Sequence, residues 1–168
     1  MKVTFPAAHL KAASFFAATQ DIRYYLNGVL AEVRSTETRL VATNGHCAAV
    51  LRNHAAQDEM PDVIIPPLAI ELALRLKSPV LELEFDGADW TLGGIPFKPV
   101  EGRYPDYRWI IPNGHSGKAA QFDTELVGRF RKAARALGQK SNPIIRHNGD
   151  GGAQVQIYGL DEIGRAHV

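Results

Sequence analysis

The chain has 168 residues, of which 45% are hydrophobic and 22% are charged. This length suits one domain or one and a half with a buried core, and the composition excludes a disordered chain. No apolar run approaches the roughly 20 residues of a membrane helix, so no membrane partner is expected. The 19 basic and 18 acidic residues nearly cancel, which argues against a protein that wraps DNA by bulk charge.

The first segment of the chain reads as one strand, one helix and three further strands. Its hydrophobic periodicity predicts strands over 2–5, 24–34, 39–43 and 48–52, and an alanine-rich helix over 7–19. Turns over 35–38 and at Asn44-Gly45 separate the last three strands.

The same order of elements follows twice more. The second segment predicts a strand over 62–65, a helix from Pro66 or Pro67 to Lys77, and strands over 80–85, 90–92 and 96–100. The third predicts a strand over 119–122, a helix capped by Asp123 or Thr124 that ends at Leu137-Gly138, and strands over 143–148, 153–158 and 162–168. Three such units predict an α+β fold whose antiparallel sheets carry helices on one face.

Catalytic and metal-binding signals are poor in this sequence. Cys47 adjoins His46, but neighbours in a strand or turn point apart and cannot form a nucleophile–base pair. The six histidines show no paired ligand spacing, so no catalytic residue, metal or cofactor is expected. The N-terminus lacks a secretory apolar region and there is one cysteine, which predicts a cytoplasmic protein.

Three motifs carry a resemblance to a known family. They are Arg-Tyr-Tyr-Leu-Asn-Gly over 23–28, Ala-Thr-Asn-Gly-His-Cys over 42–47 and Tyr-Pro-Asp-Tyr-Arg over 104–108. In order and spacing they resemble motifs of the middle domain of the bacterial DNA polymerase III beta subunit, the sliding clamp. The resemblance implies the DNA-clamp fold, with 1–115 as a complete domain of two units and 116–168 as half a domain. A clamp chain of that family holds six such units.

The resemblance also implies a cleft that binds clamp-motif peptides of polymerases or of the clamp loader. The matching positions are Leu26, Thr43, Gly45, His46, Cys47, Ala48, Pro105, Trp109 and Ile110. Cys47 and Ala48 replace an arginine and a large aliphatic residue of the family, and Trp109 replaces a basic one. The family's C-terminal tail has no match after His167-Val168. The alternative is that these residues are ordinary core and turn positions.

Non-specific contact with double-stranded DNA is the second expectation. The resemblance places Gln20, Arg23, Tyr24 and Tyr25 near the hole of the ring, although neighbouring tyrosines on a strand would point to opposite faces. The helical periodicity of the third segment separates an apolar side from a basic side, which suits diffuse phosphate contact. The basic residues are Arg129, Arg131, Lys132 and Arg135. The alternative is a helix face that is simply exposed to solvent.

We therefore expect a non-catalytic, clamp-like protein of DNA replication or repair. Half a domain leaves a sheet edge uncovered, which predicts a homodimer through residues 119–168 and permits a tetrameric ring of four chains. The alternative function is an adaptor or decoy, of phage or mobile-element origin, that binds clamp partners or a host clamp without encircling DNA. A third possibility is the product of an incomplete clamp gene that folds but does little.

Overall fold

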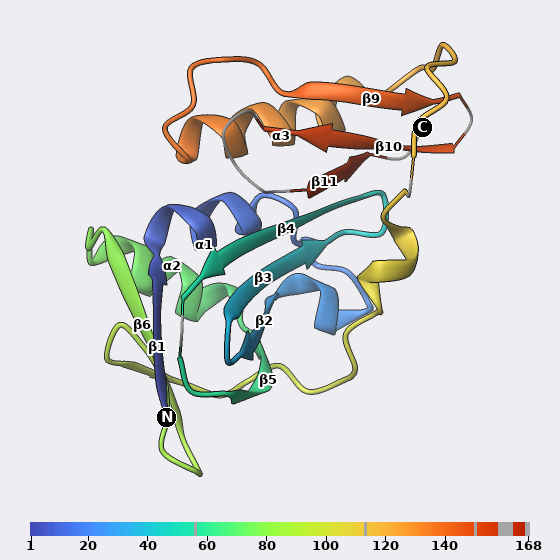
Figure 1. Cartoon of the computed structure of the whole chain (residues 1–168). Helices are drawn as coiled ribbons and strands as arrows, with labels where there is room; N and C mark the ends of the chain where they lie inside the picture. Colours follow the sequence, from blue (N-terminus) through green and yellow to red (C-terminus); the bar gives the residue numbers. More distant parts are fainter. Residues whose placement is uncertain (56, 113, 150, 158–162, 167–168) are drawn as a thin grey trace.

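The computed structural model describes residues 1–55, 57–112, 114–149, 151–157 and 163–166 (Figure 1). Within these residues the helices are α1 (Ala7–Ser14), α2 (Pro67–Arg75) and α3 (Thr124–Ala136), with 3-10 helices η1 (Tyr24–Asn27) and η2 (Tyr107–Ile110). The strands are β1 (Lys2–Pro6), β2 (Val29–Arg34), β3 (Glu37–Thr43), β4 (Cys47–His54), β5 (Met60–Ile65), β6 (Val80–Phe85), β7 (Trp90–Leu92), β8 (Ile95–Phe97), β9 (Ile144–Asn148), β10 (Gly151–Gln156) and β11 (Ile163–Ala166).

The described strands form two antiparallel sheets. One has the order β1-β6-β7-β8, and the other has the order β5-β2-β3-β4-β11-β10-β9. β1 thus joins the strands that follow α2, while β5 joins the strands that follow α1. Because each of the first two segments gives one strand to the sheet of the other, the two segments depend on each other for a complete sheet.

The larger sheet continues from the first segment into the third through β4 and β11. Cys47 lies opposite Ala166 and Val50 lies opposite Ile163 in this antiparallel pair. Figure 1 shows the third segment, with α3 beside β9 and β10, lying along this side of the first segment. The expected α+β fold with antiparallel sheets is confirmed.

The main core lies where the helices meet the inner faces of the sheets. α1 packs between α2 on one side and α3 on the other. Phe16, just after α1, and Phe130 of α3 are both buried, and their ring centroids lie 4.7 Å apart. Burial of a phenylalanine side chain stabilises a fold by about 1.5–3 kcal/mol, so this pair fastens the third segment to the first.

The ends of α3 agree with the prediction from the sequence. The Asp123 side chain accepts a hydrogen bond of 2.7 Å from the backbone N–H of Glu125, which satisfies one free donor of the first turn. Gly138 has a φ of 79°, the left-handed conformation with which helices commonly end.

The region after α1 differs from the prediction, because polar side chains fold it into a closed loop. The Asp21 N–H donates to Asn27 Oδ1 at 3.0 Å, and the Asn27 amide donates to the Asp21 carbonyl at 3.1 Å. The expected helix over 7–19 therefore ends at Ser14, and the expected strand over 24–34 begins only at Val29. The prediction that Tyr24 and Tyr25 point to opposite faces of a strand is wrong, because both lie on η1 with their rings edge to face.

Residues 119–122 are not a strand, contrary to the prediction. β1 and β5 each form a strand by pairing with another segment, and no described edge pairs with 119–122. The strand expected over 96–100 is β8 instead, and it ends at Phe97. The parts of the last two expected strands at Tyr158, Glu162, His167 and Val168 lie outside the described residues.

Candidate functional site

The turn between β3 and β4 is held by its own side chains. Thr43 Oγ1 donates to the Cys47 carbonyl at 2.9 Å and accepts from the Gly45 N–H at 3.1 Å. Asn44 Oδ1 accepts from the N–H groups of His46 and Cys47. Gly45 has a φ of 90°, and a Cβ on it would lie 3.2 Å from the Arg23 guanidinium, so glycine suits both conformation and space. The turn is therefore fixed before any partner binds.

The two sequence motifs that predict the cleft meet in the structure. The Thr43 N–H at the end of β3 donates to Tyr104 Oη at 3.0 Å across 61 positions of sequence. Burial raises the pKa of Tyr104, so the hydroxyl stays protonated. This contact holds the segment that leads into η2 against the β3–β4 turn.

A buried carboxylate holds η2 itself. Glu32 of β2 is 5% exposed, and its carboxylate accepts hydrogen bonds from the Tyr107 hydroxyl at 2.6 Å and from Arg108 Nη2 at 2.9 Å. Burial, together with the hydrogen bond to Glu32, raises the pKa of Tyr107 to about 12. Arg39 of β3 lies 3.8 Å from the same carboxylate. Glu32 was not predicted from the sequence, although it is a single acid among the apolar residues 29–33 of β2.

The nine predicted cleft residues differ in exposure and fall into a buried, a half-buried and an exposed group. Leu26, Thr43, Cys47 and Ala48 are each at most 5% exposed, and the pairing of β4 with β11 covers Cys47 and Ala48. Ile110 is half-buried in a small cluster with Tyr107. The surface of the region consists of Gly45, His46, Pro105 and Trp109, and Trp109 is 87% exposed. These four residues are the ones a partner could touch first.

Burial of Cys47 gives the fold a dependence on alkaline pH. Burial raises the pKa of the thiol from 9.0 to about 11. A group whose pKa is raised in the folded state stabilises the fold below its unfolded pKa, and this stabilisation is lost as pH rises through the folded pKa. We expect the urea midpoint to fall between about pH 9 and 11, and Cys47→Ala to flatten that fall. Curves of equal slope for the two proteins would contradict this.

The DNA-contact candidates of the first segment lie around the closed loop before η1. The Arg23 guanidinium pairs with Asp21 at 2.7 Å, and this hydrogen bond lowers the pKa of Asp21 to about 2. Tyr24 is 57% exposed, whereas Tyr25 is half-buried against Gly102. Gln20 is exposed on the same loop. Gln20, Arg23 and Tyr24 are thus the exposed members of this set, and the Arg23 guanidinium is already paired with Asp21.

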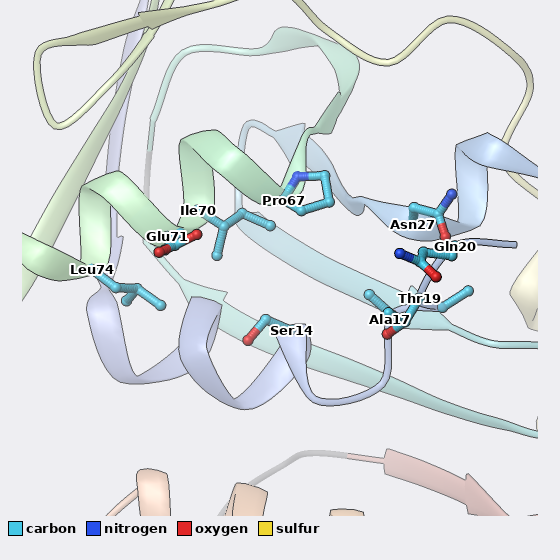
Figure 2. Close-up of a pocket in the computed structure, with 10 residues that line it drawn as sticks. Ser14, Ala17, Thr19, Gln20, Asn27, Pro67, Ile70, Glu71 and Leu74 are labelled. Carbon is cyan, nitrogen blue, oxygen red and sulfur yellow. The ribbon is translucent and has the colours of Figure 1, made fainter.

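Gln20 also borders a pocket of about 500 Å³ between the end of α1 and α2. Figure 2 shows Gln20 beside Asn27 at one end of the pocket and Leu74 of α2 at the other. The walls nearer α2 are apolar, with Ile70 and Pro67, and Ser14 and Glu71 supply polar groups. No charged cluster faces this space among the described residues, so it adds no phosphate-binding chemistry.

The basic face of α3 borders a groove of about 570 Å³ shared with α1. Arg131, Lys132 and Arg135 line it from α3, and Lys11 lines it from α1. Phe15, Gly128 and Ala136 also line it. Among the described residues, none of these four cations forms an ion pair. The helix periodicity predicted the three cations of α3, and the packing of α3 on α1 adds Lys11.

Arg129 differs from the other basic residues of α3. Its Nη1 donates a hydrogen bond of 2.9 Å to the Phe15 carbonyl, one of the free carbonyls just beyond the end of α1. The side chain is half-buried and ties α3 to α1. Arg129 therefore has a structural contact that Arg131, Lys132 and Arg135 lack.

Neither a metal-binding cluster nor a membrane-spanning helix occurs among the described residues. No group of three or more His, Cys, Asp or Glu side chains could hold a metal ion there. In the same part of the chain, no helix has the length and hydrophobicity needed to cross a membrane.

Comparisons with known proteins agree with the motifs. A family model described as DNA polymerase III beta subunit, central domain, matches residues 6–83. The beta sliding clamp of Vibrio cholerae is 34% identical over 155 residues, covering 87% of this chain and 42% of the relative. The beta sliding clamp of Pseudomonas putida is 38% identical over 156 residues, covering 88% of this chain and 42% of the relative. The chain thus spans about two-fifths of the length of these curated relatives.

Solved structures of clamps share the fold. The DNA polymerase III beta subunit of Thermotoga maritima matches with a TM-score of 0.75 at 12% identity, covering 99% of this chain and 65% of that chain. The beta subunit of Pseudomonas aeruginosa matches with a TM-score of 0.72 at 20% identity, covering 99% of this chain and 66% of that chain. The expected DNA-clamp fold is therefore confirmed. Motifs, relatives and fold together show that the chain belongs to the DNA polymerase III beta subunit, or sliding clamp, family.

Proposed function

We propose that the chain is a non-catalytic, clamp-like protein of DNA replication or repair whose α1–α3 groove contacts double-stranded DNA. The observation that carries this proposal is the set of four cations, Lys11, Arg131, Lys132 and Arg135, around one groove without ion-pair partners among the described residues. Unpaired cations that line a groove are available to phosphates, and they make contacts that do not depend on base sequence. DNA association should therefore weaken steeply with salt and show little preference among sequences.

A titration of a labelled duplex at several salt concentrations tests this function. Each phosphate neutralised adds about −0.9 to the slope of log K against log salt, so four contacts predict a slope near −3.6. Duplexes of unrelated sequence should give the same slope. Absence of binding even at low salt would refute a DNA-contact role for the groove.

We also propose the domain division that the family suggests. Residues 1–115 form a complete clamp domain, which the exchange of β1 and β5 between its halves supports. Residues 116–168 form half a domain. Family rings hold twelve units, so a closed ring would need four of these chains. Duplex DNA would pass through such a ring with the basic groove towards it.

Peptide docking at the β3–β4 turn is the second candidate function. The hydrogen bond between the Thr43 N–H and Tyr104 joins the two motifs. This contact favours peptide docking because it holds the β3–β4 turn and the segment before η2 in place before a peptide binds. Exposed apolar side chains at Pro105 and Trp109 offer burial to a peptide. Clamp-motif peptides of polymerases or of a clamp loader are the proposed ligands.

Ile110→Asp is expected to reduce binding of a clamp-motif peptide by at least about tenfold, or about 1.4 kcal/mol, because it places a charge in the apolar wall. Fluorescence anisotropy with a labelled peptide measures this. Leu26→Asp is a poorer test, since Leu26 is 2% exposed and its loss would unfold the loop. Lys98→Asp, at an exposed site outside the cleft, is the control.

The adaptor or decoy function makes a different prediction for the same two assays. A chain that captures clamp partners without encircling DNA would bind the peptide, lose it on Ile110→Asp, and show no salt-dependent DNA association. Binding of both ligands would favour the clamp function instead.

A further inference from the structure

The guanidinium of Arg23 is fixed by the carboxylate two residues before it. Asp21 Oδ1 accepts hydrogen bonds from the Arg23 backbone N–H at 2.8 Å and from Nε at 3.0 Å, and Asp21 Oδ2 accepts one from Nη2 at 2.7 Å. Two parallel bonds between an arginine and a carboxylate set the orientation of the guanidinium as well as its distance. Arg23 therefore presents its guanidinium in one orientation.

This guanidinium lies against Gly45 of the β3–β4 turn. A Cβ on Gly45 would lie 3.2 Å from Arg23 Nη2, 3.3 Å from Nη1 and 3.7 Å from Cζ. Three atoms of the group thus face the place where any other residue would carry its side chain. The Arg23 guanidinium and the backbone of the turn are therefore in direct contact, and the contact needs a glycine.

Hydrogen bonds hold both sides of this contact. On the loop side, the Leu26 N–H donates to the Arg23 carbonyl at 2.8 Å. On the turn side, the side chains of Thr43 and Asn44 hold the backbone around Gly45. The closed loop and the turn are thus two ordered pieces, and Arg23 joins them.

We propose that Arg23 is a positioning residue of the peptide-docking site, which holds the β3–β4 turn at a fixed distance from the closed loop that carries Leu26. Leu26 and Gly45 are both predicted cleft residues, and they lie on opposite sides of the contact. A cleft whose walls are already ordered binds its ligand at a lower entropic cost. Asp21 acts through Arg23. This inference rests on the peptide docking proposed above.

The ion pair separates this role from the DNA contact that the resemblance implies for Arg23. The hydrogen bond from Arg23 lowers the pKa of Asp21 to about 2, so the carboxylate is ionised at neutral pH and neutralises the guanidinium. A phosphate contact requires a positive charge, which a lysine also supplies. Contact with the carboxylate and with Gly45 at once requires the planar fork of arginine. Arg23→Lys therefore distinguishes the two roles.

Amide hydrogen exchange of the chain without ligand tests the positioning. Arg23→Ala and Arg23→Lys should each accelerate exchange of the Gly45 and His46 N–H groups by at least about fivefold, because the turn opens more often without the contact. Loss of a nearby cation lowers the local hydroxide concentration and would by itself slow exchange, so acceleration in Arg23→Ala reports opening. Unchanged exchange in Arg23→Ala, or slow exchange retained in Arg23→Lys, would overturn the proposal.

Two further variants sharpen this measurement. Arg75→Ala removes an exposed ion pair of the same kind, with Glu71 on α2, and should leave exchange in the turn unchanged. Asp21→Asn should accelerate exchange in the unmodified chain and add little to Arg23→Ala, because Asp21 acts through Arg23. Additive effects would contradict this link. The urea midpoint should stay nearly constant in Arg23→Ala, since exposed ion pairs contribute little to stability.

Fluorescence anisotropy with a labelled clamp-motif peptide tests the consequence for docking. Arg23→Ala should weaken the peptide by about five- to tenfold, because binding must then order the turn, and Arg75→Ala should bind as the unmodified chain does. Equal affinity of Arg23→Ala and the unmodified chain would overturn the docking role. An unmodified chain that binds no peptide would refute the docking function itself, whereas the exchange rates alone decide whether Arg23 holds the turn.

Discussion

Replacing Arg131, Lys132 and Arg135 with glutamate should abolish the salt-dependent association of the chain with duplex DNA. These three side chains line the groove between α1 and α3, and no described acid neutralises them. Loss of three phosphate contacts should lower the salt slope by about 3, and the introduced carboxylates would repel the backbone. At moderate salt the affinity should fall by roughly 10³-fold or more. A filter-binding titration against salt measures both quantities.

The matched control is a triple glutamate variant that makes the same change of net charge outside the groove. Lys98, Arg103 and Lys140 are exposed and do not line the groove, so their replacement by glutamate tests the effect of net charge alone. This variant should keep most of the salt slope. Equal loss of binding in both triple variants would mean that bulk charge, rather than the groove, holds the DNA.

Glu32→Ala should destabilise the fold by about 2–3 kcal/mol and weaken peptide docking. The carboxylate is buried and accepts hydrogen bonds from Tyr107 and Arg108, so its loss leaves the buried tyrosine hydroxyl without its acceptor. Arg108 is half-exposed and can turn to water, which limits the cost. η2 would loosen, and Trp109 and Ile110, which follow on the same helix, would lose their fixed position. Urea unfolding and peptide anisotropy measure the two effects.

Glu84→Ala is the control, because Glu84 lies on an exposed face of β6 and should change stability by less than about 0.5 kcal/mol. A double-mutant cycle of Glu32→Ala with Tyr107→Phe should be clearly non-additive, since the two side chains share one hydrogen bond. Additive effects would show that Glu32 acts on stability without holding η2.

Much of the fold follows from local signals in the sequence. Pro67, one of two predicted first residues, begins α2, and Asp123, one of two predicted caps, caps α3. Gly138 follows the end of α3 as predicted. These residues act through their own backbone geometry or on the backbone beside them. β6 and β7 have the predicted limits for a similar reason: the alternation of β6 is local, and in the connection Asp86 Oδ1 accepts hydrogen bonds from the N–H groups of Ala88 and Asp89.

The errors arise where contacts distant in sequence decide the structure. The repeated order of elements predicted a strand over 119–122, but a strand needs an edge to pair with, and the edges used by β1 and β5 come from other segments. Tyrosine is a common residue type in strands, yet Tyr24 and Tyr25 lie on η1, inside the loop that the hydrogen bonds between Asp21 and Asn27 close.

The candidate site was partly visible in the sequence. Periodicity on α3 located Arg131, Lys132 and Arg135, and motif matching located the turn at Gly45. Periodicity could not show that Lys11 joins the groove, because that depends on how α1 packs against α3. Nor could it show that Tyr104 meets Thr43, a contact fixed by the path of a loop over the sheet.

Retention on circular DNA tests the proposed clamp function most directly. Protomers are mixed with a closed circular duplex, and the complex is separated by gel filtration at a salt concentration that removes purely electrostatic binding. A ring of these chains predicts that protein stays with the closed circle and is lost once the DNA is cut to a linear form. Equal loss from circular and linear DNA would contradict a clamp that encircles the duplex.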